Sequence, residues 1–244
     1  MKRIFFCFTL LSAFLQVSAQ NNYATSLIPK DLLSYASAVV RNDETTIEVA
    51  GLNDIEYHVK IATTVLNRNG DEKVNTNVRY DKMESVKYIK GFIYDEFGKI
   101  IQKINERDFD DYAVTDGFSL YQDNRLKHYT KTTDHYPYTM EIEYVVKRHQ
   151  SLYFPSWHPN SQANVSIEKS SFKFVCDPTF NLRYKEFNMP GKVDISANKD
   201  GKKIYAWQIT NVKAWRDEPL TPPENKNEVR VLLAPEKFAY EKYF

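Results

Sequence analysis

Asp54-Ile-Glu-Tyr-His-Val-Lys-Ile-Ala-Thr-Thr-Val-Leu66 alternates apolar with polar side chains over most of its length. The apolar residues that share one face of this stretch are Ile55, Tyr57, Val59 and Ile61. A period of two is typical of a β-strand that is buried on one side. The next residues are Asn67-Arg-Asn-Gly70, and Asn-Gly tolerates the positive φ angles of a tight turn. We therefore expect a hairpin whose second strand runs from Val74 to Tyr80.

Runs rich in Val, Ile, Thr, Tyr and Phe recur at short intervals on both sides of this stretch. Turn sequences at Asp95-Glu-Phe-Gly98 and Asn198-Lys-Asp-Gly201 predict two further hairpins. Between Asn105 and Asn124 the alternation breaks, which predicts a long polar connection. The other expected strands are Glu44 to Ala50, Val86 to Tyr94, Lys99 to Ile104, Arg125 to Thr132, Tyr138 to His149, Ala163 to Val175, Leu182 to Phe187, Lys192 to Ser196 and Lys203 to Ile209.

Helical spacing of apolar residues is confined to Pro29–Val40, where it involves Leu32, Ala36, Val39 and Val40. Short strands separated by turn signals, without alternating helices, are typical of a β-sandwich. We therefore expect an all-β fold, an antiparallel two-sheet β-sandwich over residues 20–228 with one short N-terminal helix. The paired turns favour antiparallel neighbours throughout.

The N-terminus has the pattern of a secretory signal peptide over residues 1–19. Lys2 and Arg3 precede an apolar run from Ile4 to Val17, and small residues end at Ala19. The run is about 14 residues long, shorter than the roughly 20 that span a bilayer. We expect cleavage after Ala19, no membrane span afterwards, and export to the periplasm or the outer surface.

Charge and cysteine content narrow the function further. The formal net charge is +1, and removal of Lys2 and Arg3 makes it about −1. Nucleic-acid binding requires clustered Lys and Arg, so no nucleic-acid partner is expected. Cys176 would be the only cysteine of the mature chain, which excludes an internal disulfide. The 17 Tyr and 15 Phe must then supply much of the buried core.

Several short motifs, taken in their order along the chain, resemble a family of exported bacterial domains of unknown function that precede a transglutaminase-like domain. The resemblance covers roughly residues 27–244. The motifs that carry it are Thr63-Thr-Val-Leu-Asn-Arg-Asn-Gly70, Val78-Arg-Tyr-Asp81, Tyr94-Asp-Glu-Phe-Gly-Lys99, Asp108 to Asp111, Leu120-Tyr-Gln-Asp-Asn-Arg125, Tyr136-Pro137, Glu141-Ile-Glu-Tyr144 and the Trp157 loop.

The resemblance implies that the chemistry lies outside this chain. Leu233-Ala-Pro-Glu-Lys-Phe238 is similar to the strand through which the family passes into its next part, so we expect residues 229–244 to be an exit strand or linker. That next part would be a transglutaminase-like or cysteine-peptidase-like domain, with a Cys nucleophile activated by a His that an Asp holds. We expect this chain itself to be a non-catalytic accessory domain, without catalytic residues, metal ion or cofactor, that supports or presents substrate.

The aromatic loop Leu152-Tyr-Phe-Pro-Ser-Trp-His-Pro159 offers a different function. Fixed aromatic side chains can stack on sugars or grip a peptide at little entropic cost. The alternative function is therefore a stand-alone glycan- or peptide-binding module. The pattern favours the ordinary interpretation, in which Tyr153, Phe154 and Trp157 plug one end of the sandwich. The possible ligand-binding residues are Tyr153, Phe154, Trp157 and His158.

Two other features are open to a functional and a structural interpretation. Cys176 is a potential nucleophile, but Phe172-Lys-Phe-Val-Cys176 alternates as a strand and favours a buried core cysteine. An acidic stretch could order a Ca²⁺ ion, but its spacing does not fit a helix-loop-helix site and favours a solvated loop. The carboxylates of that stretch are Asp108, Asp110, Asp111 and Asp116.

Overall fold

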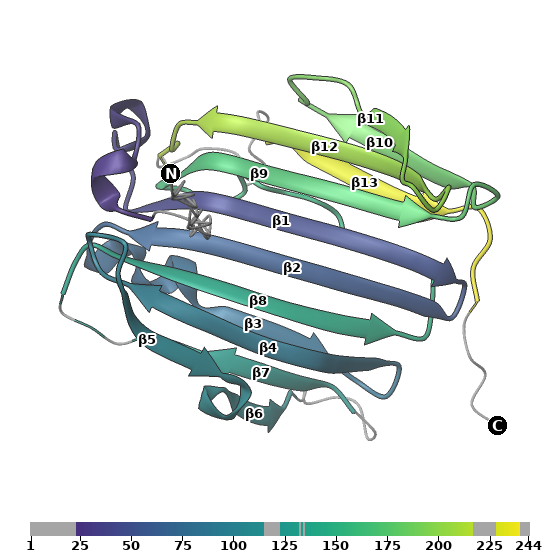
Figure 1. The fold of residues 1–244 in the computed structure, drawn as a ribbon, viewed down its shortest axis with the longest axis horizontal. Coiled ribbons are helices and arrows are strands. Elements are labelled where there is room, and N and C mark those ends of the chain that lie inside the picture. The colour runs from purple at the N-terminus through teal and green to yellow at the C-terminus, as the bar shows by residue number, and fades with distance from the viewer. Residues whose placement is uncertain (1–22, 115–122, 132, 134, 217–227, 240–244) are drawn as a thin grey trace, which may run out of the picture.

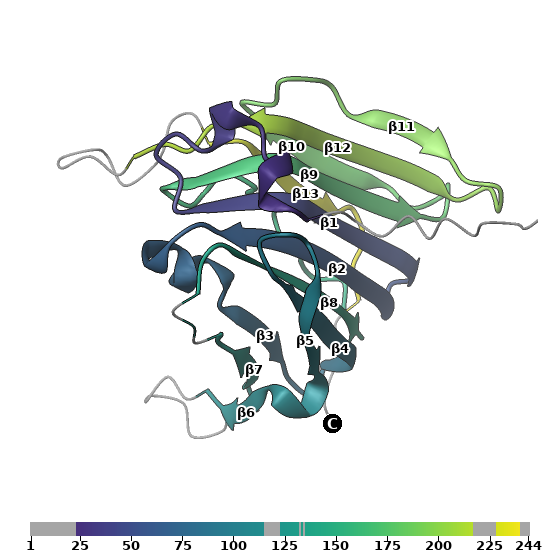
Figure 2. The same ribbon diagram turned by 60° about the vertical axis from the view of Figure 1, so that its left-hand side comes forward.

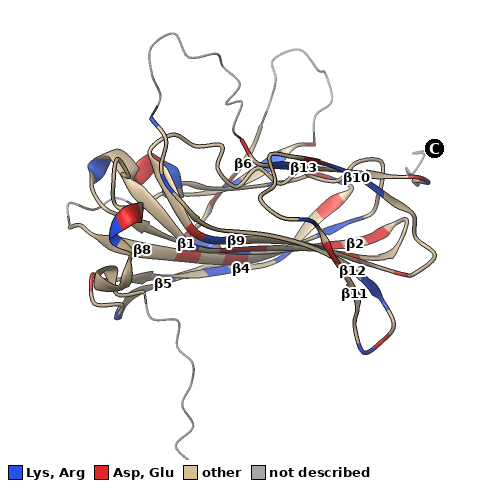
Figure 3. Cartoon of the chain, turned by 90° about the horizontal axis from the view of Figure 1, so that it is seen from above, with Lys and Arg blue, Asp and Glu red and all other residues tan. Residues whose placement is uncertain are grey.

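The computed structural model describes residues 23–114, 123–131, 133, 135–216 and 228–239. The expected signal peptide over residues 1–19 and Asp116 lie outside these residues. The described chain forms two layers (Figures 1 and 3). One layer is an eight-stranded sheet, and the other consists of two small sheets that face the same side of it.

The large sheet has the strand order β11-β12-β9-β1-β2-β8-β4-β5. Its strands are β1 (Ala38–Gly51), β2 (Asp54–Val65), β4 (Glu84–Tyr94), β5 (Ile100–Asn105), β8 (Tyr138–Arg148), β9 (Val165–Cys176), β11 (Asp194–Ala197) and β12 (Lys203–Val212). The hairpins expected at Asp95–Gly98 and Asn198–Gly201 are confirmed, because β4 pairs with β5 and β11 with β12.

The second layer is split into two parts (Figure 2). One part pairs β10 (Leu182–Phe187) with β13 (Arg230–Pro235) behind β12 and β9. The other has the order β3-β7-β6, formed by Thr76–Tyr80, Arg125–Tyr129 and Asp110–Ala113, and lies behind β8 and β4. The expected two-layer packing is therefore present, but one layer is two sheets rather than one.

The large sheet is mixed, which corrects the expectation of antiparallel neighbours throughout. β1 runs parallel to β9, from Ala38 opposite Val165 to Val49 opposite Cys176. A parallel pair needs a long connection, and more than 100 residues separate these two strands. Local turn signals report only on neighbouring strands, so they could not predict this pairing.

The prediction of a hairpin at Asn67–Gly70 is wrong. These residues lead into a 3-10 helix, Arg68–Val74, and β2 pairs with β1 and β8 rather than with β3. The Asn67 side chain accepts a hydrogen bond from the Asn69 amide. A Cβ on Gly70 would lie 2.3 Å from the Ser37 carbonyl oxygen. The glycine is therefore required for close backbone contact rather than for a hairpin turn.

The helix expected over Pro29–Val40 is also wrong over most of its length. The described N-terminal region has two 3-10 helices, Thr25–Leu27 and Lys30–Leu32. β1 then begins at Ala38, and Val39 and Val40 pair with residues of β2. Both valines are buried, and β-branched side chains favour strands over helices. Leu32 is buried as expected, with its carbonyl accepting a hydrogen bond from Ser166.

The expected long connection after Asn105 contains regular structure. A 3-10 helix, Glu106–Asp108, has a capping box with Asn105, and β6 follows directly. β6 is exposed at all four residues, so it lacks the alternation by which a strand is found in sequence. No helix in the described ranges is long and apolar enough to cross a membrane.

An aromatic core joins the two layers. Phe172 on β9 stacks with Trp157 at 6.0 Å and lies 5.8 Å from Trp207 on β12. Tyr184 on β10 packs against Trp207 at 5.5 Å, so rings of both layers are in contact. Cys176 is fully buried and lies on the same face of β9 as Phe172, which confirms the expected core position.

The segment expected to be an exit strand or linker begins inside this core. Its β13 pairs with β10, and Val231 is completely buried. Trp157 exchanges two backbone hydrogen bonds of 3.0 Å with Val231. Phe238, further on, is 56% exposed. The first residues of that segment therefore take part in the sandwich, while residues 240–244 lie outside the described part.

Candidate functional site

A pocket of about 440 Å³ lies against the inner face of the large sheet, where the two small sheets leave a gap. The strands β1, β2 and β8 form its floor, and β3 and the Trp157 loop form its walls. Apolar floor residues such as Val59 and Ile61 are only partly buried there. The volume is within the range of small-molecule sites.

Asp43 forms one polar end of the pocket. Its Oδ2 accepts a hydrogen bond of 2.6 Å from Ser170 Oγ on the neighbouring strand β9. Ser170 Oγ accepts in turn from Trp157 Nε1 at 3.2 Å. Burial raises the pKa of the Asp43 carboxyl, although the Ser170 hydrogen bond opposes this shift. The parallel register that aligns Asp43 with Ser170 creates this end of the site.

Arg148 forms the other polar end, with a side chain that is only 8% exposed. It makes an ion pair with Glu84 and donates to the Tyr57 hydroxyl at 3.1 Å and to the Tyr153 hydroxyl at 2.9 Å. Its guanidinium lies 5.0 Å from the Tyr57 ring centre and 4.6 Å from that of Tyr153. Burial raises the pKa of Glu84 against the effect of Arg148, and it raises the pKa of Tyr57 to about 12.

The two polar ends are well separated. Asp43 of β1 lies opposite Ile61 of β2, and Ile61 lies opposite Ile142 of β8. Arg148 lies six positions further along β8, or about 20 Å at 3.3–3.4 Å per residue. Arg148 therefore cannot neutralise Asp43.

Tyr144 lies on the floor between the two ends, one row of side chains away from Asp43. Burial, followed by the charge of Asp43, raises its pKa to about 12. Its hydroxyl has no hydrogen-bond partner among the residues that the structure describes. It is available as a donor or an acceptor to a ligand.

Three of the four residues predicted from the aromatic loop line this pocket: Tyr153, Trp157 and His158. Tyr153 is 56% exposed, whereas Trp157 is buried against Phe172. His158 Nδ1 lies 3.0 Å from Glu228. Phe154 lies elsewhere in the core, with its ring centre 5.0 Å from that of Phe174. The loop thus combines core-filling with pocket-lining side chains.

The sequence prediction missed the polar ends of the site. A signal for Arg148 was present, because it continues the apolar face of β8 after Val146. Asp43 similarly precedes Thr45 and Ile47 on the inner face of β1. A charged residue in the register of an apolar face indicates a buried polar site. The alignment of Asp43 with Ser170 required knowledge of the parallel pairing.

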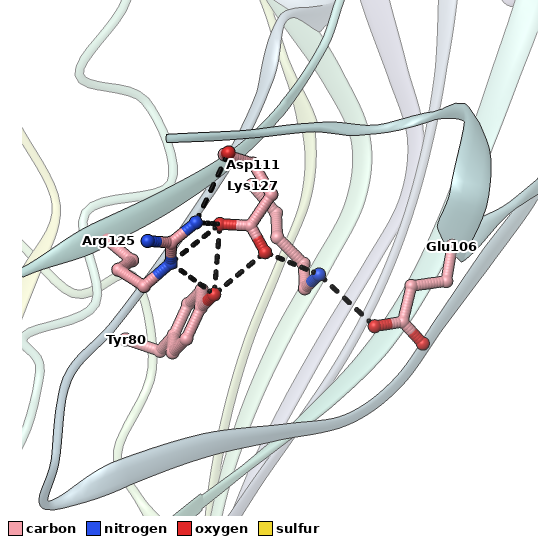
Figure 4. A network of polar contacts seen from close by, with 5 residues as sticks. All are labelled: Tyr80, Glu106, Asp111, Arg125 and Lys127. Atoms are coloured by element: carbon pink, nitrogen blue, oxygen red, sulfur yellow. Dashed lines mark hydrogen bonds and ion pairs between the residues drawn. The ribbon is translucent and has the colours of Figure 1, made fainter. Parts of the chain in front are cut away.

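The other two candidates from the sequence, Cys176 and the acidic stretch, make structural contacts instead. Burial raises the pKa of Cys176 to about 11, the opposite of what a nucleophilic thiol needs. In the acidic stretch, Asp111 forms ion pairs with Arg125 at 2.9 Å and with Lys127 at 3.0 Å (Figure 4). Tyr80 also donates to Asp111, so this carboxylate connects β6, β7 and β3. The described residues contain no group of three or more His, Cys, Asp or Glu arranged to hold a metal ion.

Comparison with known proteins gives one family model and a number of solved structures that are similar to this chain. The model of a domain of unknown function with a solved structure, DUF3857, matches residues 53–216. A comparison with curated proteins found no match. The fold is similar to the 2.00 Å crystal structure of a candidate protease from Parabacteroides distasonis, with a TM-score of 0.68 and 13% sequence identity.

The structural match covers 81% of this chain but only 40% of the Parabacteroides protein. At 13% identity the likeness concerns the fold alone. Aminopeptidase A of Legionella pneumophila in complex with aspartic acid gives a TM-score of 0.35 at 9% identity, covering 81% of this chain and 21% of that one. A score this low supports no inference.

Replacing Arg148 with Met should destabilise the protein by about 3–5 kcal/mol, because Glu84 would keep a buried charge without its cation. The double variant R148M/E84Q should recover much of that loss. Urea-induced unfolding measures both effects. Lys87→Met, which breaks the more exposed ion pair with Glu56, is the control and should cost at most about 1 kcal/mol. Equal losses for R148M and K87M would contradict a buried ion pair.

Proposed function

Because the chain belongs to the DUF3857 family, we propose that it is a non-catalytic accessory domain of a larger exported protein. In this proposal it supports, or presents substrate to, a transglutaminase-like or cysteine-peptidase-like domain of the same protein. The observation that carries the proposal is the coverage of the structural match. A protein described as a candidate protease contains this fold in 40% of its length, which leaves more than half for other parts.

The proposed division of labour is consistent with the state of the one described cysteine. A nucleophilic thiol must be accessible and have a lowered pKa. Cys176 is buried, and its pKa is raised. The pocket, by contrast, offers an open apolar floor with polar groups at two ends, which suits binding. Export to the periplasm or the outer surface is proposed from residues 1–19.

A test compares the product of the complete gene with a form that lacks residues 23–239. We expect the complete protein to cleave or transamidate a peptide substrate, and the shortened form to show a higher KM or a lower kcat/KM. Titration of the reactive thiol with iodoacetamide provides the control. A thiol that reacts equally in both forms separates loss of substrate presentation from misfolding.

Two results would contradict the accessory role. One is a complete gene that encodes no further domain with Cys, His and Asp. The other is equal kcat/KM for the two forms with equal thiol reactivity.

A second candidate function is a peptide- or glycan-binding module. The observation that favours it is that Tyr153, Trp157 and His158 of the aromatic loop line the same pocket. This function requires no second domain. Which ligand binds would then depend on the chemical groups that line the pocket.

A further inference from the structure

Among the described residues, two acidic side chains line the pocket, and only Glu84 is paired with a cation. Glu84 is paired with Arg148, whereas Asp43 makes no ion pair with any residue that the structure describes. We propose that the Asp43 end of the pocket binds the basic side chain of a peptide, lysine or arginine. The ammonium or guanidinium group lies against Asp43, and the aliphatic part of the side chain lies along the apolar floor. This inference deepens the proposed binding role and rests on it.

The Arg148 end provides an internal example of such an environment. There a guanidinium lies against the rings of Tyr57 and Tyr153 and pairs with a carboxylate. Cations within about 6 Å of aromatic ring centres are attracted by the ring quadrupole. The Asp43 end has the same components, a carboxylate and nearby aromatic side chains, without the cation.

Asp43 is held in position before a ligand arrives. Ser170 donates to its Oδ2, and Ser170 is fixed in turn by the Trp157 indole. A carboxylate offers about four acceptor positions, so others remain for the N–H donors of a cation. Because the groups are already ordered, binding costs little conformational entropy at this end.

The energetics favour a cation over a neutral or an anionic ligand. A half-buried carboxylate without a cation carries a desolvation cost, and a cation that enters the pocket offsets it. The free hydroxyl of Tyr144 can accept a hydrogen bond from the same cation. An anion would instead be repelled by Asp43.

The shape favours a peptide over a glycan. Sugar binding relies on an exposed aromatic face, but Trp157 is only 5% exposed and is stacked on Phe172 at an interplanar angle of 10°, while the exposed Tyr153 ring lies against the Arg148 guanidinium. Val59 and Ile61 provide an apolar surface suited to the methylene groups of a long basic side chain. A pocket of about 440 Å³ also has room for the flanking peptide backbone.

The proposal is tested by isothermal titration of the full chain with three tripeptides capped at both ends, so that only the side chain carries charge. Ac-Ala-Lys-Ala-amide and Ac-Ala-Arg-Ala-amide should bind at least about tenfold more tightly than the norleucine analogue, which has the stem without the charge. Asp43→Asn should weaken binding of the lysine peptide about tenfold or more, and Tyr144→Phe should weaken it less. Asp200→Asn, in the exposed turn between β11 and β12, is the matched control and should bind as the wild type does.

Thermal unfolding of each variant shows whether it is folded at the titration temperature. Should Asp43→Asn prove unfolded, the comparison of lysine with norleucine on the wild-type chain decides alone. Equal binding of those two peptides, unchanged binding by a folded Asp43→Asn, or no binding of any peptide at millimolar concentration would overturn the proposal. Binding of a cell-wall polysaccharide without the peptides would overturn it in favour of a glycan module. None of these results bears on the thiol reactivity or kcat/KM of the longer protein, so the accessory role is judged separately.

Discussion

The stack of Trp157 on Phe172 is the contact on which the rest of the structure depends. Phe172 belongs to β9 of the large sheet, while the Trp157 backbone pairs with Val231 of the second layer. One residue thus attaches the aromatic loop and β13 to the inner face of the sheet. The Trp157 indole also donates to Ser170, which donates to Asp43. The packing that stabilises the sandwich therefore also positions the polar group of the pocket.

The pocket follows from an incomplete second layer. The outer face of the large sheet is polar, with cross-strand ion pairs such as Lys90–Glu143 and Lys147–Asp54, and it needs little cover. The inner face is apolar and must be covered. Two small sheets cover its two sides and leave β1, β2 and β8 partly open between them. Charged residues on that open face, Asp43 and Arg148, are buried enough to be costly, so each needs a partner.

The sequence was informative wherever the signal was local. Period-two alternation located β2, β8 and the end of β9, and two turn sequences located the hairpins β4–β5 and β11–β12. Prediction from the sequence failed where the contacting residues are far apart along the chain. The parallel pairing of β1 with β9 has no local signature, and Gly70 has its role because Ser37 lies against it. Three of the four loop residues do line the pocket, but its acidic end depends on that parallel register, which no single stretch of sequence encodes.

The central claim is that Asp43, beside the gap in the second layer, is partly desolvated by burial and has no cation among the described residues. The most direct measurement is an NMR titration of the Asp43 side-chain carboxyl carbon in the ligand-free chain, with Asp43→Asn used to assign the resonance. A pKa clearly above the ordinary 3.8 is the predicted result, because burial outweighs the Ser170 hydrogen bond. A pKa at or below 3.8 would mean that water or a cation already stabilises the carboxylate, and it would contradict the account.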